Sequence, residues 1–228
     1  MTSHIFKIVF AVLMTVPLIS KAGLIDRGNG LIYDDVKNLT WLQDTDYART
    51  IGYTGVRLVD SFGRVSNSVD PYGRMTWTQA KIWADELVFG GYSDWRLPTT
   101  TPAVSGFGIT TSELGYMYFV NLTNTPAYEN GVFLPGGYGL KNKGPFNMPD
   151  GPNYWTSTPR QGSSNEDAWV FLTSIGFQGT TSADNGSLFN SWAVRDGDVS
   201  VVPEPSNLIL MITGIFLLAS VMFQKRIE

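Results

Sequence analysis

Carboxylates, hydroxyls and aromatic rings are the groups of this chain that could do chemistry. The sequence contains no cysteine and one histidine, His4, which falls in the N-terminal leader described below. The absence of both residue types from the rest of the chain excludes zinc sites made of His and Cys, Ser-His-Asp catalysis and cysteine nucleophiles. Carboxylate chemistry, a Ser-Lys pair and the binding of hard cations by oxygen ligands stay open.

Four pairs of carboxylates lie close enough in the sequence to be weighed as acid–base catalysts. They are Asp34 with Asp35, Asp44 with Asp46, Asp85 with Glu86, and Glu166 with Asp167. A glycosidase needs two carboxylates on either side of the bond that it cleaves, and closeness in sequence does not report that arrangement. We therefore expect a protein that is not an enzyme, and a carboxylate-dependent enzyme is the alternative.

Oxygen ligands for a metal ion are concentrated in or beside predicted loops. Asp150, Glu166, Asp167 and Asp184 offer the hard oxygen donors that calcium prefers. The chain has no EF-hand spacing, and acidic loop residues are usually just solvated. We expect no cofactor, and calcium at these four residues is the alternative that stays open.

Aromatic side chains in a long loop are the candidates for ligand binding. Residues 123–151 are rich in Gly, Pro and Asn, and loops of this length in compact domains are usually functional or disordered. Tyr128 and Tyr138 lie in this loop and could stack on a sugar ring through their apolar faces. Arg195, beside Trp192, could hold an anionic sugar, although a partly buried ion pair with a carboxylate is the stronger expectation.

The elements that must position these residues read as one α+β domain with two helices and several short antiparallel strands. Residues 30–35 and 38–43 predict a hairpin around a turn at 35–37. Further strands are predicted at 153–158, 168–173 and 191–195, and residues 49–74 read as a polar loop.

The first helix is predicted to begin at Thr76. Thr76 and Gln79 have capping-box spacing, in which each side chain bonds the backbone N–H of the other residue. The apolar face would consist of Trp77, Ala80, Ala84 and Leu87, and Gly90-Gly91 would end the helix. The second helix is predicted at 112–122, with Ser112 as its cap and with Leu114, Met117, Tyr118 and Leu122 facing the core.

The N-terminus has the pattern of a secretory signal peptide. Lys7 precedes an apolar stretch at 8–19, and Ser20 and Ala22 are small residues at the two positions that signal peptidase reads. We predict cleavage between Ala22 and Gly23. The alternative is an N-terminal anchor that is not cleaved.

The C-terminus carries an uncharged apolar segment, residues 208–223, followed by Lys225 and Arg226. Short basic segments next to an apolar segment stay in the cytoplasm, which would place the body of the protein outside it. The apolar segment is 16 residues long. That is shorter than the ~20 residues that span a bilayer comfortably.

The tail resembles the PEP-CTERM sorting signal of Gram-negative bacteria. The matching parts are Pro203, Glu204 and Pro205, the apolar segment and the basic end, in that order. The resemblance implies recognition and processing by an exosortase, a membrane-bound cysteine peptidase. It also implies a link to exopolysaccharide and the biofilm matrix. A plain C-terminal membrane anchor is the alternative for the tail.

The chain therefore divides into a signal peptide at 1–22, a domain at 23–200 and a sorting signal at 201–228. Residues 23–202 contain 12 Lys and Arg against 18 Asp and Glu, a net charge of −6. An acidic body argues against nucleic acid as a partner, because binding phosphates requires basic patches.

The body resembles the Lcl C-terminal domain family over most of residues 30–198. The matching segments are 39–42, 77–80, 91–99, 154–158 and 192–195, and the most specific motif is Asp-Trp-Arg-Leu-Pro-Thr at 94–99. The family's namesake is an adhesin domain that binds sulfated glycosaminoglycans, and the resemblance implies a relation to the C-type lectin-like fold. Within the motif we predict Trp95 in the core, with Asp94 paired with Arg96 or capping a turn.

These features together predict an exported protein that is first a precursor anchored in the membrane by its C-terminal segment. After processing it would belong to the cell surface or the extracellular matrix. Its domain is expected to bind a polysaccharide or another matrix component without catalysis. An enzyme acting on extracellular polysaccharide and a purely structural matrix scaffold are the alternatives.

Overall fold

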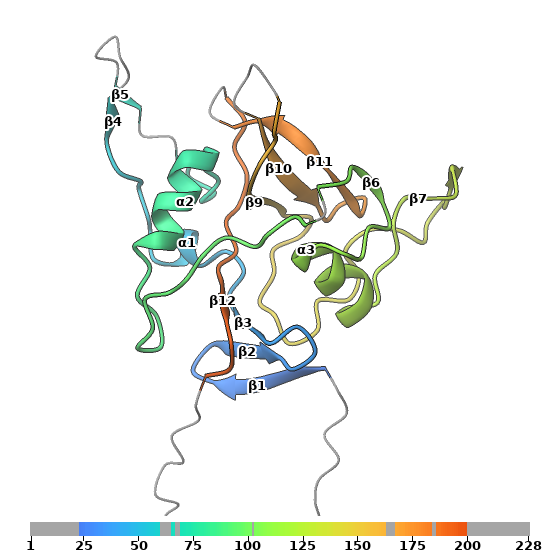
Figure 1. Ribbon diagram of the computed structural model, residues 1–228, viewed down its shortest axis with the longest axis horizontal. Helices are drawn as coiled ribbons and strands as arrows, with labels where there is room; N and C mark the ends of the chain where they lie inside the picture. The colour runs from blue at the N-terminus through green and yellow to red at the C-terminus, as the bar shows by residue number, and fades with distance from the viewer. Residues whose placement is uncertain are drawn as a thin grey trace, which may run out of the picture.

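Two four-stranded antiparallel sheets form the framework of the chain (Figure 1). The computed structural model describes residues 23–59, 65–66, 69–101, 103–162, 167–183 and 186–199. The first sheet has the order β1-β2-β3-β12, from β1 (Leu24–Gly28), β2 (Leu31–Asp34), β3 (Leu39–Leu42) and β12 (Val194–Asp196). The second has the order β6-β11-β10-β9, from β6 (Gly106–Phe107), β9 (Asn153–Pro159), β10 (Asp167–Leu172) and β11 (Phe177–Ser182). The predicted α+β class is confirmed.

The predicted hairpin at 30–43 is the centre of the first sheet. β2 pairs with β3, and the buried carboxylate of Asp34 closes the turn by accepting hydrogen bonds from the backbone N–H groups of Val36 and Lys37, both at 3.0 Å. This use of an Asp side chain is a common way to stabilise a turn. β12 then pairs with β3 from the far end of the chain, so the sheet joins segments about 155 residues apart.

The strands predicted at 153–158 and 168–173 are confirmed as β9, which is one residue longer, and β10, which is shifted by one residue. The strand predicted at 191–195 is shorter and begins at Val194. β11 was not predicted, because its sequence FQGTTS contains a single large apolar residue. It forms a strand because it pairs with β10 along its whole length, from Ser182 opposite Asp167 to Phe177 opposite Leu172.

The first predicted helix is present as α2 (Trp77–Asp85), with Thr76 at its N-cap position. The predicted capping box is wrong, because the Thr76 side chain makes no capping hydrogen bond and Gln79 is bonded elsewhere. The Gln79 amide donates to the carbonyl of Val56 at 2.7 Å and accepts from its N–H at 3.0 Å. The helix also ends at Asp85, before the predicted stop at Gly90.

The second predicted helix is present as α3 (Glu113–Tyr116), continued by a π-helix, η1 (Met117–Asn121). Ser112 caps it as predicted, because its hydroxyl accepts a hydrogen bond from the N–H of Gly115 at 3.1 Å. All four residues predicted to face the core are buried, namely Leu114, Met117, Tyr118 and Leu122.

The predicted polar loop at 49–74 contains regular structure. It begins within α1 (Tyr47–Thr50) and includes the two-stranded pair β4 (Leu58–Val59) and β5 (Val65–Ser66). A second small pair, β7 (Tyr128–Glu129) and β8 (Val132–Phe133), lies in the predicted loop at 123–151. Within the described ranges no helix is both long and apolar enough to cross a membrane. The predicted span at 208–223 lies outside those ranges.

Tryptophans fill the space where the two sheets meet. Trp41, Trp95, Trp155 and Trp192 are all fully buried, and the rings of Trp41 and Trp192 lie 4.6 Å apart. The indole N–H groups of Trp95, Trp155 and Trp192 donate to backbone carbonyls, as in the 2.8 Å bond from Trp192 to Leu42, whereas that of Trp41 has no partner among the described residues. These tryptophans come from the segments quoted above for the family resemblance, so the shared motifs mainly build the core. Trp95 lies in the core as predicted.

Candidate functional site

A pocket of about 670 Å³ lies between β6, η1 and the β7–β8 hairpin. Its lining comes from Phe107 of β6, Gly108 and Thr110 after that strand, Phe119 of η1, residues 124–126 and residues 128–131. Figure 1 shows β7 at the margin of the molecule, on the side of α3 and β6. Much of the lining therefore comes from the long loop at 123–151, which the sequence predicted to be functional or disordered. We call this pocket the hairpin pocket.

The turn between β7 and β8 explains why this part of the loop is ordered. Asn130 and Gly131 both have positive φ, 51° and 79°, as a two-residue type I′ hairpin turn requires. Asn-Gly is the dipeptide best suited to that turn. The sequence thus carried a signal for the hairpin, and our prediction of an unstructured loop missed it.

Backbone contacts fix the hairpin to the second sheet and to the rest of the loop. Ala127 N–H donates to the carbonyl of Ile175, and Leu134 N–H donates to the carbonyl of Ala127, both at 2.8 Å. The buried Asn124 accepts hydrogen bonds from the N–H groups of Lys141 and Asn142 at 2.9 and 2.8 Å. One wall of the pocket is therefore held by its own hydrogen bonds.

A row of five aromatic rings runs along this wall from the second sheet to the loop. Neighbouring ring centroids are 4.8 to 5.5 Å apart, in the order Phe177, Phe107, Tyr128, Phe133 and Tyr138. Tyr128 and Phe133 remain 41% and 46% exposed. Large aromatic side chains that are held in place and still exposed are unusual unless a partner covers them.

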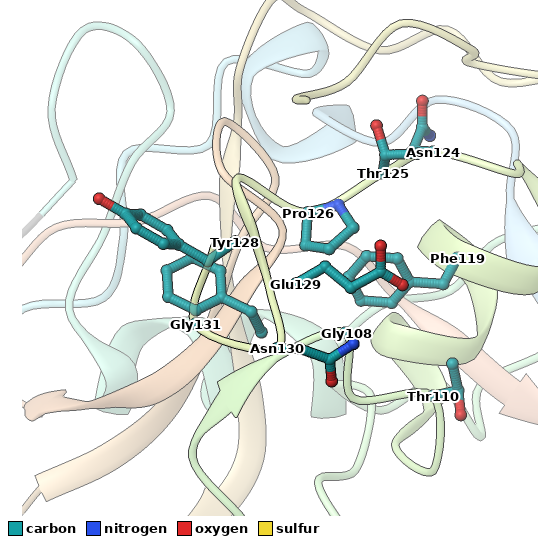
Figure 2. A pocket seen from close by; sticks show the side chains of 11 residues that line it. Gly108, Thr110, Phe119, Asn124, Thr125, Pro126, Tyr128, Glu129, Asn130 and Gly131 are labelled. Carbon is teal, nitrogen blue, oxygen red and sulfur yellow. The ribbon is translucent and has the colours of Figure 1, made fainter. Parts of the chain in front are cut away.

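Polar groups face the same space. Figure 2 shows Glu129, Asn130, Asn124 and Thr125 around the pocket, together with the rings of Phe119 and Pro126. The Glu129 side chain makes no hydrogen bond or ion pair with any residue that the structure describes. The pocket thus combines apolar rings with hydrogen-bonding groups of both kinds, which is the composition of a small-molecule or glycan site.

The two tyrosines predicted to bind a ligand belong to this row of rings. Tyr128 lines the pocket, and Tyr138 is half-buried at the far end of the row, beyond Phe133. The sequence analysis missed Phe107 and Phe133, whose contribution depends on the pairing of β6 with β11 and of β7 with β8.

Arg195, the third residue predicted to bind a ligand, does not line the hairpin pocket. Its guanidinium donates two hydrogen bonds to Asp94, at 2.8 and 2.9 Å, and lies 4.1 Å from the ring centroid of Tyr92. The bond from Arg195 lowers the pKa of Asp94. This geometry matches the predicted ion pair in a partly buried position.

The predicted pairing of Asp94 with Arg96 is wrong. Arg96 instead donates two hydrogen bonds to Glu113, both at 2.8 Å, and a third to Asp196 at 2.5 Å. Asp94 pairs with Arg195. The Asp-Trp-Arg motif is therefore joined to α3 through Glu113 and to β12 through Arg195 and Asp196.

The candidate calcium ligands that the structure describes are each paired with a cation. Asp150 lies 2.7 Å from the Lys143 ammonium, and Asp167 lies 3.1 Å from the Arg160 guanidinium. In the described ranges no group of three His, Cys, Asp or Glu residues could hold a metal ion. Glu166 and Asp184 lie outside those ranges, so calcium at these loops stays an untested alternative.

The carboxylate pairs weighed as catalysts have distinct environments. Asp34 is buried in the β2–β3 turn, and Asp85 and Glu86 are exposed at the end of α2. Asp44 accepts a hydrogen bond from the N–H of Asp46 at 3.0 Å. Burial raises the pKa of Asp46, and a hydrogen bond from Asn190 opposes that effect. None of these pairs lines the hairpin pocket.

Comparison with protein families settles the relationship that the motifs suggested. Residues 30–195 match the Lcl C-terminal domain. The chain belongs to the Lcl C-terminal domain family. The match spans the second sheet, the first sheet except β1, the hairpin pocket and the Asp94–Arg195 pair, and membership supports an extracellular or surface-associated protein. No curated protein and no solved structure matches the chain, so the lectin-like relation stays a prediction.

The predicted sorting residues lie mostly outside the described ranges. These are Ala22, Pro203, Glu204, Pro205, Lys225 and Arg226. Gly23, the predicted first residue after cleavage, begins the described chain. Its backbone N–H donates to the carboxylate of Asp35 at 2.6 Å.

Proposed function

We propose that this protein is exported, sorted by an exosortase, and retained at the cell surface or in the extracellular matrix, where its Lcl domain binds polysaccharide. The observation that carries the binding proposal is the row of rings beside the hairpin pocket, with Tyr128 and Phe133 exposed. Sugar rings have apolar C–H faces that stack on aromatic side chains and hydroxyl edges that need donors and acceptors. The lining of the hairpin pocket supplies both.

The residues that line the hairpin pocket favour binding without catalysis. Among the described residues that line the hairpin pocket, Glu129 is the sole carboxylate. A glycosidase of the usual kind places two carboxylates on either side of the bond that it cleaves. A single carboxylate suits hydrogen bonding to sugar hydroxyls.

The test is co-sedimentation of the exported protein with the exopolysaccharide of the producing cells, with and without a calcium chelator. Tyr128→Ala should weaken sedimentation about tenfold, since one stacked aromatic ring is worth on the order of 1 to 2 kcal/mol. Val88→Ala, at an exposed position outside the hairpin pocket, is the matched control and should bind as the unmodified protein does. Equal sedimentation of both variants would contradict the proposed site.

Two further readouts separate the alternatives. Release of reducing ends from the polysaccharide, abolished by Glu129→Gln, would indicate an enzyme. Concentration-dependent oligomers without any polysaccharide binding would indicate a scaffold. Loss of binding on chelation would indicate that calcium is required, and residues 150, 166, 167 and 184 would be the first to mutate.

Processing of the tail is tested separately. We expect the mass of the surface-bound protein to show that part of the C-terminal tail has been removed. Replacing Pro203 and Glu204 with Ala should leave the full tail in place and keep the protein in the membrane fraction. An unchanged tail mass in the unmodified protein would contradict sorting by an exosortase.

A further inference from the structure

A second pocket, of about 330 Å³, lies beside α1 and shares no lining residue with the hairpin pocket. It is lined by Asp46 and Arg49 at α1, by Tyr72 and Arg74 of a tight turn, by residues 149–152 and by Asn190. We call it the Tyr72 pocket. No segment quoted for the family resemblance contributes to its lining.

Tyr72 forms an exposed but well-held platform at this pocket. Its side chain is 60% exposed, yet the turn that carries it is closed by Asp70, which accepts hydrogen bonds from the N–H groups of Tyr72 and Arg74, both at 2.9 Å. Gly73 packs so closely on α1 that a Cβ there would lie 2.5 Å from the Cβ of Arg49. The tyrosine ring and Arg49 are therefore fixed relative to each other.

Two guanidinium groups flank the tyrosine ring. The Cζ atoms of Arg74 and Arg49 lie 5.4 and 6.0 Å from its centroid. Arg74 is bonded to Asp70 at 2.7 Å. The Arg49 guanidinium makes no hydrogen bond with a described residue, and its ion-pair partner Asp46 is 3.8 Å away. Its five N–H donors are available to a ligand.

Buried acceptors face the donors of Arg49. Asp46 and Asn190 are 8% and 7% exposed, and Asn190 donates its amide N–H to Oδ1 of Asp46 at 3.0 Å. Neither Oδ2 of Asp46 nor Oδ1 of Asn190 accepts a hydrogen bond from a described residue. Both residues line the pocket, so these two oxygens can accept hydrogen bonds from a ligand that supplies O–H groups.

The gap between Arg49 and Asp46 fits a hydroxyl group. The 3.8 Å between Nη1 and Oδ2 is too long for a direct hydrogen bond. A hydroxyl oxygen at roughly 2.8 Å from each atom could accept from the guanidinium and donate to the carboxylate at once. Water can do the same, but an apolar ring face beside the gap favours a ligand that has both hydroxyls and a C–H face.

The charges around the pocket select against ions. Its lining carries two arginines and two aspartates, Asp46 and Asp150, so the formal charges cancel. A site for phosphate or sulfate would have a lining with net positive charge, which this pocket lacks. A neutral polyhydroxyl ring is the better match.

We infer that the Tyr72 pocket is a second saccharide site, which takes a neutral hexopyranose unit stacked on Tyr72 with one hydroxyl bridging Arg49 and Asp46. This site is separate from the one in the proposed function. Two sites on one body would let the protein hold two polysaccharide chains, or one chain more tightly.

Saturation-transfer NMR on the exported protein tests this inference. The probes are the methyl glycosides of glucose, mannose and galactose, with glucuronic acid as the charged comparison. We expect at least one neutral glycoside to bind at millimolar concentration. Glucuronic acid should displace it weakly or not at all. Arg49→Ala and Tyr72→Ala should each weaken binding about tenfold, and Tyr72→Phe should preserve it.

Controls separate this site from the hairpin pocket and from misfolding. Arg160→Ala removes an arginine that is similarly exposed and outside both pockets, so it should leave glycoside binding unchanged. Tyr128→Ala should reduce polysaccharide sedimentation while the glycoside signal that depends on Arg49 remains. Arg49→Ala keeps the Cβ that packs on Gly73, and its thermal unfolding should match that of the unmodified protein within about 2 °C.

Three results would overturn the inference. They are binding of no neutral glycoside, binding that Arg49→Ala and Tyr72→Ala leave intact, and binding of glucuronic acid in preference to the neutral probes. Each can occur while Tyr128 still proves necessary for polysaccharide binding, so the proposed function is judged independently.

Discussion

Arg195 and Asp94 form a two-point ion pair that joins residues 101 positions apart. The Nε and Nη2 groups of Arg195 donate to the two carboxylate oxygens of Asp94 at 2.8 and 2.9 Å. The arginine side chain is 10% exposed and the aspartate side chain 56% exposed. The pair thus fixes β12 to the most specific motif of the family, with the charge of Arg195 largely buried.

Replacing Arg195 should destabilise the protein through this pair. Arg195→Lys keeps the charge but loses the planar fork, and we expect a loss of about 1 to 2 kcal/mol in the free energy of unfolding, since Asp94 is well exposed to solvent. Denaturant unfolding measures it. Arg160→Lys, in a more exposed ion pair, is the control and should change stability by less than about 0.5 kcal/mol.

The same pair sets a pH dependence. The pKa of Asp94 is lowered in the folded protein, so the pair stabilises fully above the unfolded value of about 3.9 and is lost as the pH falls through the folded value. Asp94→Asn should therefore be less stable than the unmodified protein at neutral pH, and the gap should close below about pH 4. A gap of constant size from pH 7 down to pH 3 would contradict this.

Gln79→Glu distinguishes the observed role of this residue from a capping box. A capping box tolerates glutamate, whereas the carbonyl of Val56 needs the amide donor that only glutamine has. Gln79 is fully buried, so we expect Gln79→Glu to cost about 2 to 4 kcal/mol in the free energy of unfolding. A cost below about 0.5 kcal/mol would favour the capping box. Thr76→Ala should cost little, because the Thr76 hydroxyl makes no capping bond.

Gly131→Ala tests whether the hairpin turn positions the hairpin pocket. The φ of 79° strains any residue with a Cβ, although nothing lies within 4 Å of the added atom. We expect a local cost of about 1 kcal/mol and weaker polysaccharide sedimentation, with little change in the melting temperature. Gly136→Ala, also at positive φ with open space around it but outside the lining, is the matched control and should leave sedimentation unchanged.

Asp46→Asn should remove the free-energy cost of holding an ionised carboxylate at this buried position in the folded protein. Burial raises the pKa of Asp46, while Asn190 and Arg49 act to lower it and Asp44 and Asp70 to raise it. Because the pKa is raised, Asp46 stays protonated to a higher pH in the folded state than in the unfolded state. The free energy of unfolding therefore falls as the pH rises from about 3.9 through the folded value. Asp46→Asn should gain stability relative to the unmodified protein over that interval. Melting temperatures at a series of pH values measure it, and a difference that does not vary with pH would refute the assignment.

Gly23 offers a test of maturation. Cleavage after Ala22 would turn the Gly23 nitrogen into an ammonium group 2.6 Å from the Asp35 carboxylate, which strengthens the hydrogen bond. N-terminal sequencing should find Gly23 first. Protein that begins at Gly23 should be about 1 kcal/mol more stable than protein that retains Ala22. Asp35→Asn should abolish that difference, and a difference that survives it would mean that Asp35 is not the partner.

The sequence by itself determined the local elements of this protein. The β2–β3 hairpin, the start of α2 at Trp77 and the Ser112 cap of α3 depend on residues within a few positions of one another, so local patterns predicted them. The ordered motifs likewise identified the family. The same patterns named Tyr128 and Tyr138, because tyrosines in a long Gly-, Pro- and Asn-rich loop are informative without any knowledge of packing.

Only the tertiary structure decided which side chains meet. Gln79 binds Val56 rather than Thr76, and Asp94 binds Arg195 rather than Arg96, because a buried polar group takes the partner that packing brings to it. Sequence spacing cannot rank such partners when they lie 23 or 101 positions away. Both pockets follow the same rule. Their lining comes from segments that no local pattern relates, and the burial of apolar side chains in a shared core brings those segments together.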